Sequence, residues 1–266
     1  MPRNGWANIL IRVQNHGLVY YRFSKLGSEG GPRHAFFTRL GGVSAPPYAS
    51  LNVGASVGDD PRAVEANRRR CYAALGLAEQ QVVTCYQVHS DVVLPVTPAD
   101  GGKVVESTDG LCTNSVGLAL FLRFADCVPI LLYDAEHQAI ALVHAGWKGT
   151  LAGIAARAVQ AMREHYGSRP EAIHAGLGPA IGPCCYEIGP DLAEPFARRF
   201  GDAVLRRHAA GGQSLDLPAA NARVLAEEGV RHIEHAGLCT ACRVDEFFSH
   251  RQEGGQTGRL AALAVL

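Results

Sequence analysis

Short apolar runs separated by polar and glycine-rich turns occupy the middle of the chain. Most have the length of a β-strand and lie between turn-forming residues, which predicts strands over 81–88, 91–96, 117–124, 128–133, 139–143 and 172–175. Residues 34–58 begin in the same way and continue as a loop rich in Gly, Ser, Pro and Asn. Further strand-like pieces are expected around Ile233, at Phe247 and Phe248, and over 260–266.

Apolar positions with helical spacing predict helices among these strands. Val64, Tyr72 and Leu75 lie on one helical face, with Pro61 in the first turn and Gly76 at the end. The same reasoning predicts helices over 151–166, 191–200 and 219–228. Strands that alternate with helices favour the α/β fold class, in which helices cover a mixed β-sheet. A length of 266 residues without a Ser/Pro-rich or charge-rich linker favours a single domain.

The charge balance narrows the class of partner. Lys and Arg number 25, as do Asp and Glu, so the formal net charge is zero and the sequence pI is about 7.2. Proteins that bind duplex nucleic acid or anionic membrane surfaces usually carry a basic excess. We therefore expect a small-molecule partner, with neither nucleic acid nor membrane bound, and we expect a monomer.

The apolar runs and the cysteines indicate in which cellular compartment the protein is expected. Residues 1–18 lack the continuous apolar stretch of a signal peptide, and the longest apolar runs are too short to span a bilayer. Eight cysteines in 266 residues are too dilute and too irregularly spaced for a disulfide scaffold, which suits a reducing compartment. We expect a cytoplasmic protein.

Three residues with metal-ligating side chains stand at the ends of predicted strands: His89, Cys127 and His144. Their separations are too wide for a zinc finger, so three different strands must converge to bring them together. Two imidazoles and one thiolate would leave the fourth position of a tetrahedral zinc ion open, as in a catalytic zinc site. From the residues alone, hydrogen-bonded loop histidines and a small buried cysteine are an equally good interpretation.

The other cysteines do not define a site by themselves. Cys239 and Cys242 form a single CxxC pair without a second pair, and His250 is a further ligand only if the loop folds back. Cys184 and Cys185 adjoin in a Gly/Pro-rich turn. We expect these two to pack as buried thiols, and we expect the loop after the CxxC pair to bind anions through its arginines.

Four polar residues in loops are candidates for substrate contact. Arg39 and Asn52 lie in the irregular loop after the first strand, and Arg251 and Arg259 lie in the polar loop near the C-terminus. An arginine offers a planar fork that binds phosphate with two hydrogen bonds. For Arg39, an ordinary salt bridge within the loop is an equally good interpretation.

Motifs along most of the chain are similar to those of one family. They occur in family order from about residue 34 to the C-terminus: FFTRLGGVSAPPYASLNVG, QVHS, STDGL, ADCVPILLYD, HAGWKGT, GPAIGPCCYEIG and CTACRVDEFFSHRQEGGQTGR. The chain resembles the YfiH-type proteins, formerly called multicopper polyphenol oxidase laccase-domain proteins and regarded as purine nucleoside phosphorylases. This resemblance divides the domain into an N-terminal strand region with a Gly-rich loop, 1–33, and a YfiH-like part, 34–266.

The resemblance implies a fold shared with cysteine-hydrolase-like toxins and a zinc site formed by His89, Cys127 and His144. It also implies phosphorolysis of adenosine, inosine, guanosine and methylthioadenosine to the free base and ribose-1-phosphate, together with adenosine deamination. Asp126 is then expected to orient a ligand imidazole or to carry a proton beside Cys127. Arg39, with Arg251 or Arg259, is expected to anchor phosphate.

Three alternatives stay open. Cys127 as nucleophile with His144 as base would make a metal-free amidohydrolase acting on peptidoglycan precursors. Copper could replace zinc at the Cys/His site and give laccase-like oxidation of polyphenols. Multicopper oxidases use HxH pairs, however, and this sequence contains no HxH triplet. In a third alternative the metal only ties strands together and the protein binds a partner.

Overall fold

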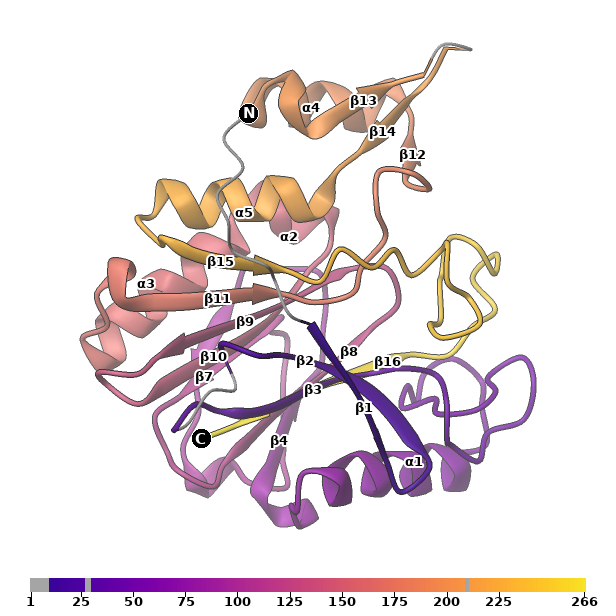
Figure 1. Ribbon diagram of the computed structural model, residues 1–266, viewed down its shortest axis with the longest axis vertical. Helices are drawn as coiled ribbons and strands as arrows, with labels where there is room; N and C mark the ends of the chain where they lie inside the picture. The colour runs from indigo at the N-terminus through magenta and orange to yellow at the C-terminus, as the bar shows by residue number, and fades with distance from the viewer. Residues whose placement is uncertain (1–9, 27–29, 209–210) are drawn as a thin grey trace.

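Two mixed β-sheets lie face to face in the described part of the chain, and helices cover both outer faces (Figure 1). The computed structural model describes residues 10–26, 30–208 and 211–266. Part of the predicted Gly-rich loop, 27–29, lies outside these residues. A small antiparallel sheet and one helix form a separate layer at one end of the molecule (Figure 1).

The sheets are mixed because parallel and antiparallel pairs occur in each. The first sheet has the spatial order β1 (Leu10–Asn15), β2 (Leu18–Phe23), β3 (Arg33–Phe37), β16 (Leu260–Val265), β8 (Ala119–Phe124), β4 (Val82–Cys85) and β6 (Val104–Val105). The second has the order β15 (His232–His235), β11 (Ile173–Leu177), β9 (Val128–Asp134), β10 (Ala139–Ala145), β7 (Gly110–Thr113) and β5 (Val93–Pro95). The small sheet has the order β12 (Glu187–Ile188), β14 (Gln213–Leu215) and β13 (Leu205–Arg207).

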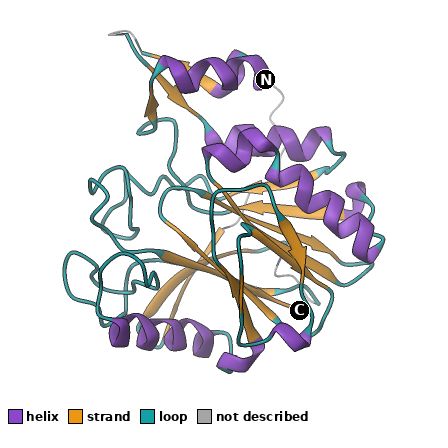
Figure 2. Cartoon of the chain, turned by 180° about the vertical axis from the view of Figure 1, so that it is seen from behind, coloured by secondary structure: helices purple, strands orange, loops and turns teal. Residues whose placement is uncertain are grey.

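Helices pack on the outer faces, as both ribbon views show (Figures 1 and 2). The α-helices are α1 (Pro61–Ala74), α2 (Trp147–Ala152), α3 (Ile154–Tyr166), α4 (Pro190–Phe200) and α5 (Leu217–Glu227). Short 3-10 helices are η1 (Glu79–Gln81), η2 (Pro98–Asp100), η3 (Pro170–Ala172) and η4 (Asp202–Val204). The helix predicted over 151–166 is divided in two because Gly153 takes a left-handed conformation between α2 and α3.

The central strands are continuously apolar because successive side chains face opposite sides of the sheet and both sides are buried. In β9, Ile130 and Leu132 pack with the helices on one face, whereas Leu131 and Tyr133 pack against the first sheet. Both faces of the strand are therefore buried, and it needs no polar face. On the other side of the molecule Phe121 packs edge-on against Tyr72 of α1, with ring centroids 5.3 Å apart.

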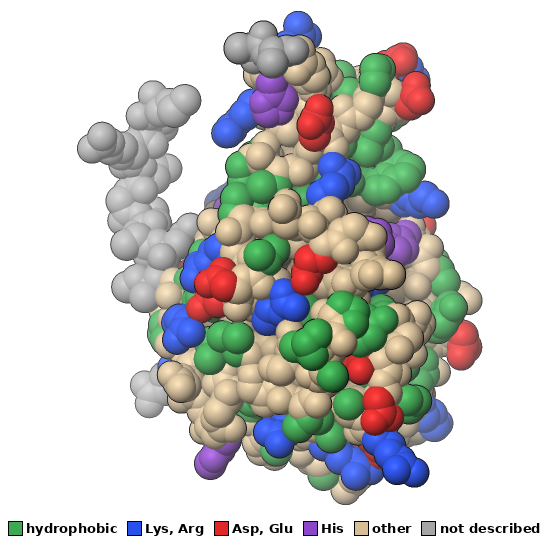
Figure 3. Space-filling model, turned by 90° about the vertical axis from the view of Figure 1, so that its right-hand side faces the viewer, with side chains coloured by type: hydrophobic (Ala, Val, Ile, Leu, Met, Phe, Trp, Pro, Cys, Tyr) green, Lys and Arg blue, Asp and Glu red, His purple; other side chains and the backbone are tan. Residues whose placement is uncertain are grey.

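The predicted α/β class, with mixed sheets and helical cover, is confirmed, although there are two large sheets instead of one. The strand-like piece predicted at Phe247 and Phe248 is wrong: both lie in the loop between β15 and β16 and are fully buried beside Tyr21 and Leu260. Within the described ranges no helix is both long and apolar enough to cross a membrane. Acidic and basic side chains are interspersed on the face shown in Figure 3, as zero net charge suggests.

Close packing between the sheets depends on a glycine of β11. A Cβ atom at Gly176 would lie 2.5 Å from Cε2 of Phe23 and 2.6 Å from Cδ1 of Leu26. We predict that Gly176→Ala lowers the free energy of unfolding by about 1–3 kcal/mol, because a buried aromatic ring must move. Urea unfolding followed by circular dichroism measures this change.

Gly189→Ala is the matched control. Nothing lies within 4 Å of a Cβ atom built at Gly189, which caps α4. Its loss of stability should stay below about 1 kcal/mol, the scale of a changed N-cap residue. Equal losses in the two variants would contradict the packing argument.

Candidate functional site

A cleft of about 470 Å³ opens at the edge where the chain passes from the first sheet to the second. Its walls come from segments far apart in the sequence. They are Gly54, Ser56, Gln87, His89, Arg123, Ala125, Asp126, Cys127, His144, Trp147, Ile181, Tyr186, Leu217, His250, Arg251 and Arg259. All three predicted metal ligands line this cleft, together with Asp126, Arg251 and Arg259.

A sharp turn between β8 and β9 places Cys127 between the two sheets. Strand β8 belongs to the first sheet and β9 to the second, so residues 125–127 must cross from one to the other. Asp126 has a left-handed backbone conformation, with φ of 80°. Such a value is uncommon for a non-glycine residue and reverses the chain within a short distance.

The two histidines approach Cys127 from different elements. His144 lies near the end of β10, on the face that Ile140 and Leu142 direct toward the first sheet. His89 lies in the loop between β4 and β5, in a left-handed conformation with φ of 63°. The ring centroids of the histidines are 4.9 Å apart, and one ligand atom from each residue and Cys127 lie within 4.8 Å of one another.

Gly146 makes this close approach possible. A Cβ atom at this position would lie 3.0 Å from both Cys127 Sγ and His89 Cδ2. Any larger residue would therefore push these two groups apart. The glycine in the HAGW motif is the sequence signal for this constraint.

A buried carboxylate orders both histidine segments. Asp109 Oδ1 accepts a hydrogen bond from His144 Nδ1 at 2.9 Å. Asp109 Oδ2 accepts hydrogen bonds from the backbone N–H groups of Val88 and Ser90 at 3.0 and 2.7 Å, and from the Ser90 hydroxyl at 2.9 Å. Since Val88 and Ser90 flank His89, one carboxylate fixes the loop of one imidazole and the ring orientation of the other.

The electrostatics of the site favour a thiolate. Burial acts to raise the pKa of Cys127, but the charge of His144 and hydrogen bonds from His144 and His89 outweigh it and lower the pKa to about 6. Burial acts to lower the pKa of His144, while the sulfur and the Asp109 carboxylate raise it to about 9. Deprotonated sulfur is the form that binds metals and the form that acts as a nucleophile.

Three arginines supply positive charge to the cleft. Arg123 donates to the carbonyl of Cys85 at 2.6 Å, Arg251 to that of Glu187 at 2.6 Å, and Arg259 to that of Thr257 at 3.1 Å. Carbonyl acceptors hold a guanidinium in place without cancelling its charge.

The pKa of Arg123 reflects repulsion between neighbouring guanidinium groups. Burial lowers the pKa of Arg123, and the charges of Arg68 and Arg259 lower it further. An anion bound between these guanidinium groups would relieve their repulsion.

Two predicted substrate residues lie away from the cleft. Arg39 forms an ion pair with Glu253 at 3.0 Å and stacks on Phe248, with 4.4 Å between the guanidinium carbon and the ring centroid. Asn52 is fully buried, and its Oδ1 accepts from the backbone N–H of Arg259 at 2.8 Å. Arg39 and Asn52 order the loops behind the cleft and are not among the residues that line it. A direct contact of either residue with substrate stays a prediction.

Asp126 has different partners from those expected. Its carboxylate accepts from the Thr240 hydroxyl at 2.6 Å and from the backbone N–H of Arg251 at 2.7 Å. The sequence suggested that Asp126 orients a histidine of the site. In the structure the carboxylate bonded to His144 is that of Asp109. Asp126 still lines the cleft, so a role as proton carrier stays a prediction.

Sequence reasoning also missed several wall residues. Arg123 stands inside an apolar run and suggested only that the run does not span a membrane. Trp147 is 38% exposed at the cleft, and Tyr186 lies under Arg251, with 5.0 Å from the guanidinium carbon to the ring centroid. His250, considered as a ligand beside the CxxC pair, lines the cleft instead. Aromatic and basic residues near strand ends are the signal that could have found this group.

Comparison with known proteins agrees with the resemblance in the sequence. Residues 33–266 match a family model described as multi-copper polyphenol oxidoreductase laccase. A purine nucleoside phosphorylase of Corynebacterium glutamicum is 41% identical over 236 residues, which cover 88% of this chain and 94% of the relative. One of Deinococcus radiodurans is 43% identical over 234 residues, covering 88% of each chain.

Solved structures give the same result for the fold. YlmD from Geobacillus stearothermophilus has a TM-score of 0.90 and 35% identity, with 97% of this chain and 98% of that chain covered. YfiH of Bacillus licheniformis has a TM-score of 0.88 and 33% identity, with 95% and 97% covered. The chain is similar in sequence and fold to YfiH and YlmD, and it belongs to the family described as multi-copper polyphenol oxidoreductase laccase.

Proposed function

We propose that this chain is a zinc-dependent purine nucleoside phosphorylase that uses the cleft around Cys127. The observation that carries the proposal is the presence, in one cleft, of a Cys/His group able to hold a metal ion and of three arginines suited to phosphate. Relatives covering most of the chain are named purine nucleoside phosphorylases. The proposed substrates are adenosine, inosine, guanosine and methylthioadenosine, with adenosine deamination as a second reaction.

The side chains fit a zinc ion. His144 Nδ1 is engaged by Asp109, so Nε2 is the nitrogen left for a metal. With Cys127 Sγ and one nitrogen of His89, it makes a set of two imidazoles and one thiolate, the donor set that would hold the ion. A zinc ion held by these residues would supply Lewis-acid chemistry toward the purine. Copper can occupy the same set, because affinity for such ligands is higher for copper than for zinc.

The arginines and aromatic side chains position the two substrates. In phosphorolysis a phosphate oxygen bonds to ribose C1′ while the bond from C1′ to the purine nitrogen breaks, and the purine leaves with the electron pair. Arg123, Arg251 and Arg259 hold the phosphate, and the exposed ring of Trp147 offers a flat surface for the base. Asp126 can carry the proton that the departing purine takes up.

One observation favours a second candidate function, hydrolysis by a cysteine nucleophile. Cys127, His144 and Asp109 form a continuous chain of contacts in the order of a nucleophile, a base and an orienting carboxylate. His89 has no role in such a triad but also bonds to the sulfur. We favour the metal site because it uses all three groups that surround the thiolate.

Removing the thiolate tests the proposal. We predict that Cys127→Ala lowers kcat/KM for inosine phosphorolysis at least about 100-fold, because loss of the metal removes stabilisation of the leaving purine. Phosphate-dependent release of hypoxanthine and ribose-1-phosphate is the measurement. Cys71→Ala, at a fully buried position of α1, should keep the wild-type rate. A folded Cys127→Ala protein with wild-type turnover would overturn the proposal.

Alkylation of the wild-type protein separates the two candidate functions. With zinc bound, Cys127 should resist alkylation by iodoacetamide until a chelator is added, as peptide mass spectrometry of Cys127 would show. Rapid alkylation that zinc does not slow, with activity that persists in chelator, would instead support the cysteine nucleophile.

Asp109 should act through His89 and His144. We predict that Asp109→Asn weakens zinc binding about 10- to 100-fold, because an amide cannot accept all the hydrogen bonds that the carboxylate accepts. Competition with a chromophoric chelator measures this affinity. Asp134→Asn is the matched control, since Asp134 is equally buried and bonds to His137 at 2.8 Å outside the cleft. Equal zinc affinity in the wild type and the Asp109 variant would contradict the assigned role.

The two arginine environments predict different effects on phosphate. We predict that Arg259→Gln raises the KM for phosphate at least about 10-fold, because one charge-assisted contact worth about 1.5 kcal/mol or more is lost. Arg39→Gln should lower the stability of the fold, because it removes the ion pair with Glu253, and should leave the KM for phosphate within about twofold. Initial rates at varied phosphate and saturating inosine measure both values. A KM for phosphate that rises in Arg39→Gln and not in Arg259→Gln would instead support Arg39 as the phosphate anchor.

A further inference from the structure

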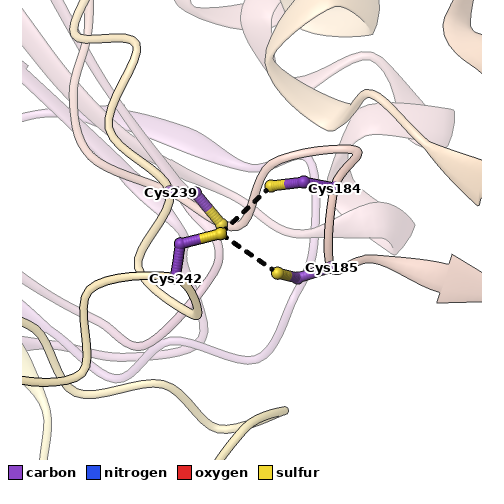
Figure 4. A group of neighbouring side chains, drawn as sticks. All are labelled: Cys184, Cys185, Cys239 and Cys242. Atoms are coloured by element: carbon purple, nitrogen blue, oxygen red, sulfur yellow. Dashed lines mark hydrogen bonds between the residues drawn. The ribbon is translucent and has the colours of Figure 1, made fainter.

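Four cysteines from two separate loops meet beyond the ends of β11 and β15. Cys184 and Cys185 lie between β11 and β12, and Cys239 and Cys242 follow β15. Strands β11 and β15 are parallel neighbours, so their carboxyl ends lie at the same edge of the second sheet. A parallel bridge between Ala180 and Cys239 then holds the two loops side by side. Figure 4 shows the four sulfur atoms converging on one region.

The sulfur positions match a single tetrahedral ion. All four Sγ atoms lie within 4.8 Å of one another. Cys242 Sγ is 3.4 Å from Cys184 Sγ and 3.3 Å from Cys185 Sγ. Zinc–thiolate bonds of about 2.3 Å place tetrahedral sulfurs about 3.8 Å apart, so each of these two pairs would separate by about half an ångström around a bound ion. An iron–sulfur cluster, which binds its cysteines to several separate irons, needs a wider ring.

Thiols alone do not account for this gathering. The S–H group is a weak donor and sulfur a weak acceptor, so four thiols gain little from mutual contact. Cys184 and Cys242 are exposed to solvent, where a cluster of free thiols would oxidise readily. The backbone N–H of Gly182 donates to Cys239 Sγ at 3.2 Å, a contact that favours a thiolate. The expectation that Cys184 packs as a buried thiol is therefore wrong.

We propose that Cys184, Cys185, Cys239 and Cys242 form a closed structural site for one zinc ion, separate from the site at Cys127. Four thiolates fill a tetrahedral zinc ion and leave no position for substrate. The second pair of ligands that the CxxC pair needs is thus supplied by two adjacent cysteines. They lie 54 residues earlier in the chain, counted from Cys185 to Cys239. Soft sulfur ligands in this number select zinc over the harder divalent cations.

The ion would tie together the two loops that hold Asp126. The backbone N–H of Ile181, in the first loop, donates to the Asp126 carbonyl at 2.9 Å. The Thr240 hydroxyl, in the second loop, donates to the Asp126 carboxylate at 2.6 Å. The same first loop carries Tyr186 to the cleft wall. Zinc at the four cysteines therefore braces the turn next to Cys127 without touching substrate.

Metal analysis of the full chain tests this site independently of the proposed function. Cys127→Ala protein, expressed with zinc and purified without oxygen, leaves the four cysteines unchanged and should retain one zinc ion per chain. Cobalt exchanged into that variant should give thiolate-to-cobalt charge-transfer bands and the visible bands of a tetrahedral site. Changing Cys184→Ser and Cys242→Ser together in the Cys127→Ala background should abolish both signals, whereas adding Cys71→Ala should change neither.

Three results would overturn the assignment. The first is Cys127→Ala protein that carries no zinc and whose four cysteines react at once with a thiol reagent under native conditions. The second is iron bound in place of zinc, and the third is disulfides among these cysteines, each after purification without oxygen. Since the Cys127→Ala arm leaves these loops intact, misfolding of the serine variants does not remove the test. Loss of nucleoside turnover in Cys127→Ala concerns the proposed function alone.

Discussion

One buried carboxylate, that of Asp109, accepts hydrogen bonds from both segments that carry the histidines of the site. An ionised carboxylate without exposure to water is costly unless donors surround it. Burial acts to raise its pKa, but His144 and the backbone N–H groups of Ser90 and Val88 outweigh this effect and lower the pKa to about 2. The negative charge therefore persists and holds the imidazole of His144 toward Cys127. The hydrogen bonds of Asp109 thus join the His89 loop to β10.

The fold supplies the rest of the arrangement through the meeting of two sheets. Strand β8 ends in the first sheet and β9 begins in the second, so the turn at Cys127 must lie where the sheets come together. His144 is on the face of β10 directed at the same region, and Gly146 leaves room for the sulfur. The arginines then come from the end of β8 and from the C-terminal loop. Packing between the sheets thus positions a thiolate, two imidazoles and positive charge around one cleft.

The strands that are buried on both faces could be predicted from the sequence. Most contacts between distant segments could not. Strands β9 and β10 were predictable because each is apolar on both faces. The grouping of His89, Cys127 and His144 as expected metal ligands came from the family resemblance, since spacing along the chain does not reveal which strand ends converge. Asp109, just before β7, and Arg123, in β8, look like ordinary polar residues until the fold shows what they face. The four cysteines were unpredictable for the same reason, because parallel pairing of β11 with β15 brings their loops together.

In the proposed function, three distant side chains share one metal ion, which would keep a position open for substrate. A crystal of the protein soaked with inosine and phosphate, with anomalous data collected at the zinc edge, tests it most directly. We expect a zinc peak bonded to His89, Cys127 and His144, with a fourth ligand that is not a protein side chain. Density that shows the two imidazoles turned away from the sulfur of Cys127, with no metal among them, would contradict it.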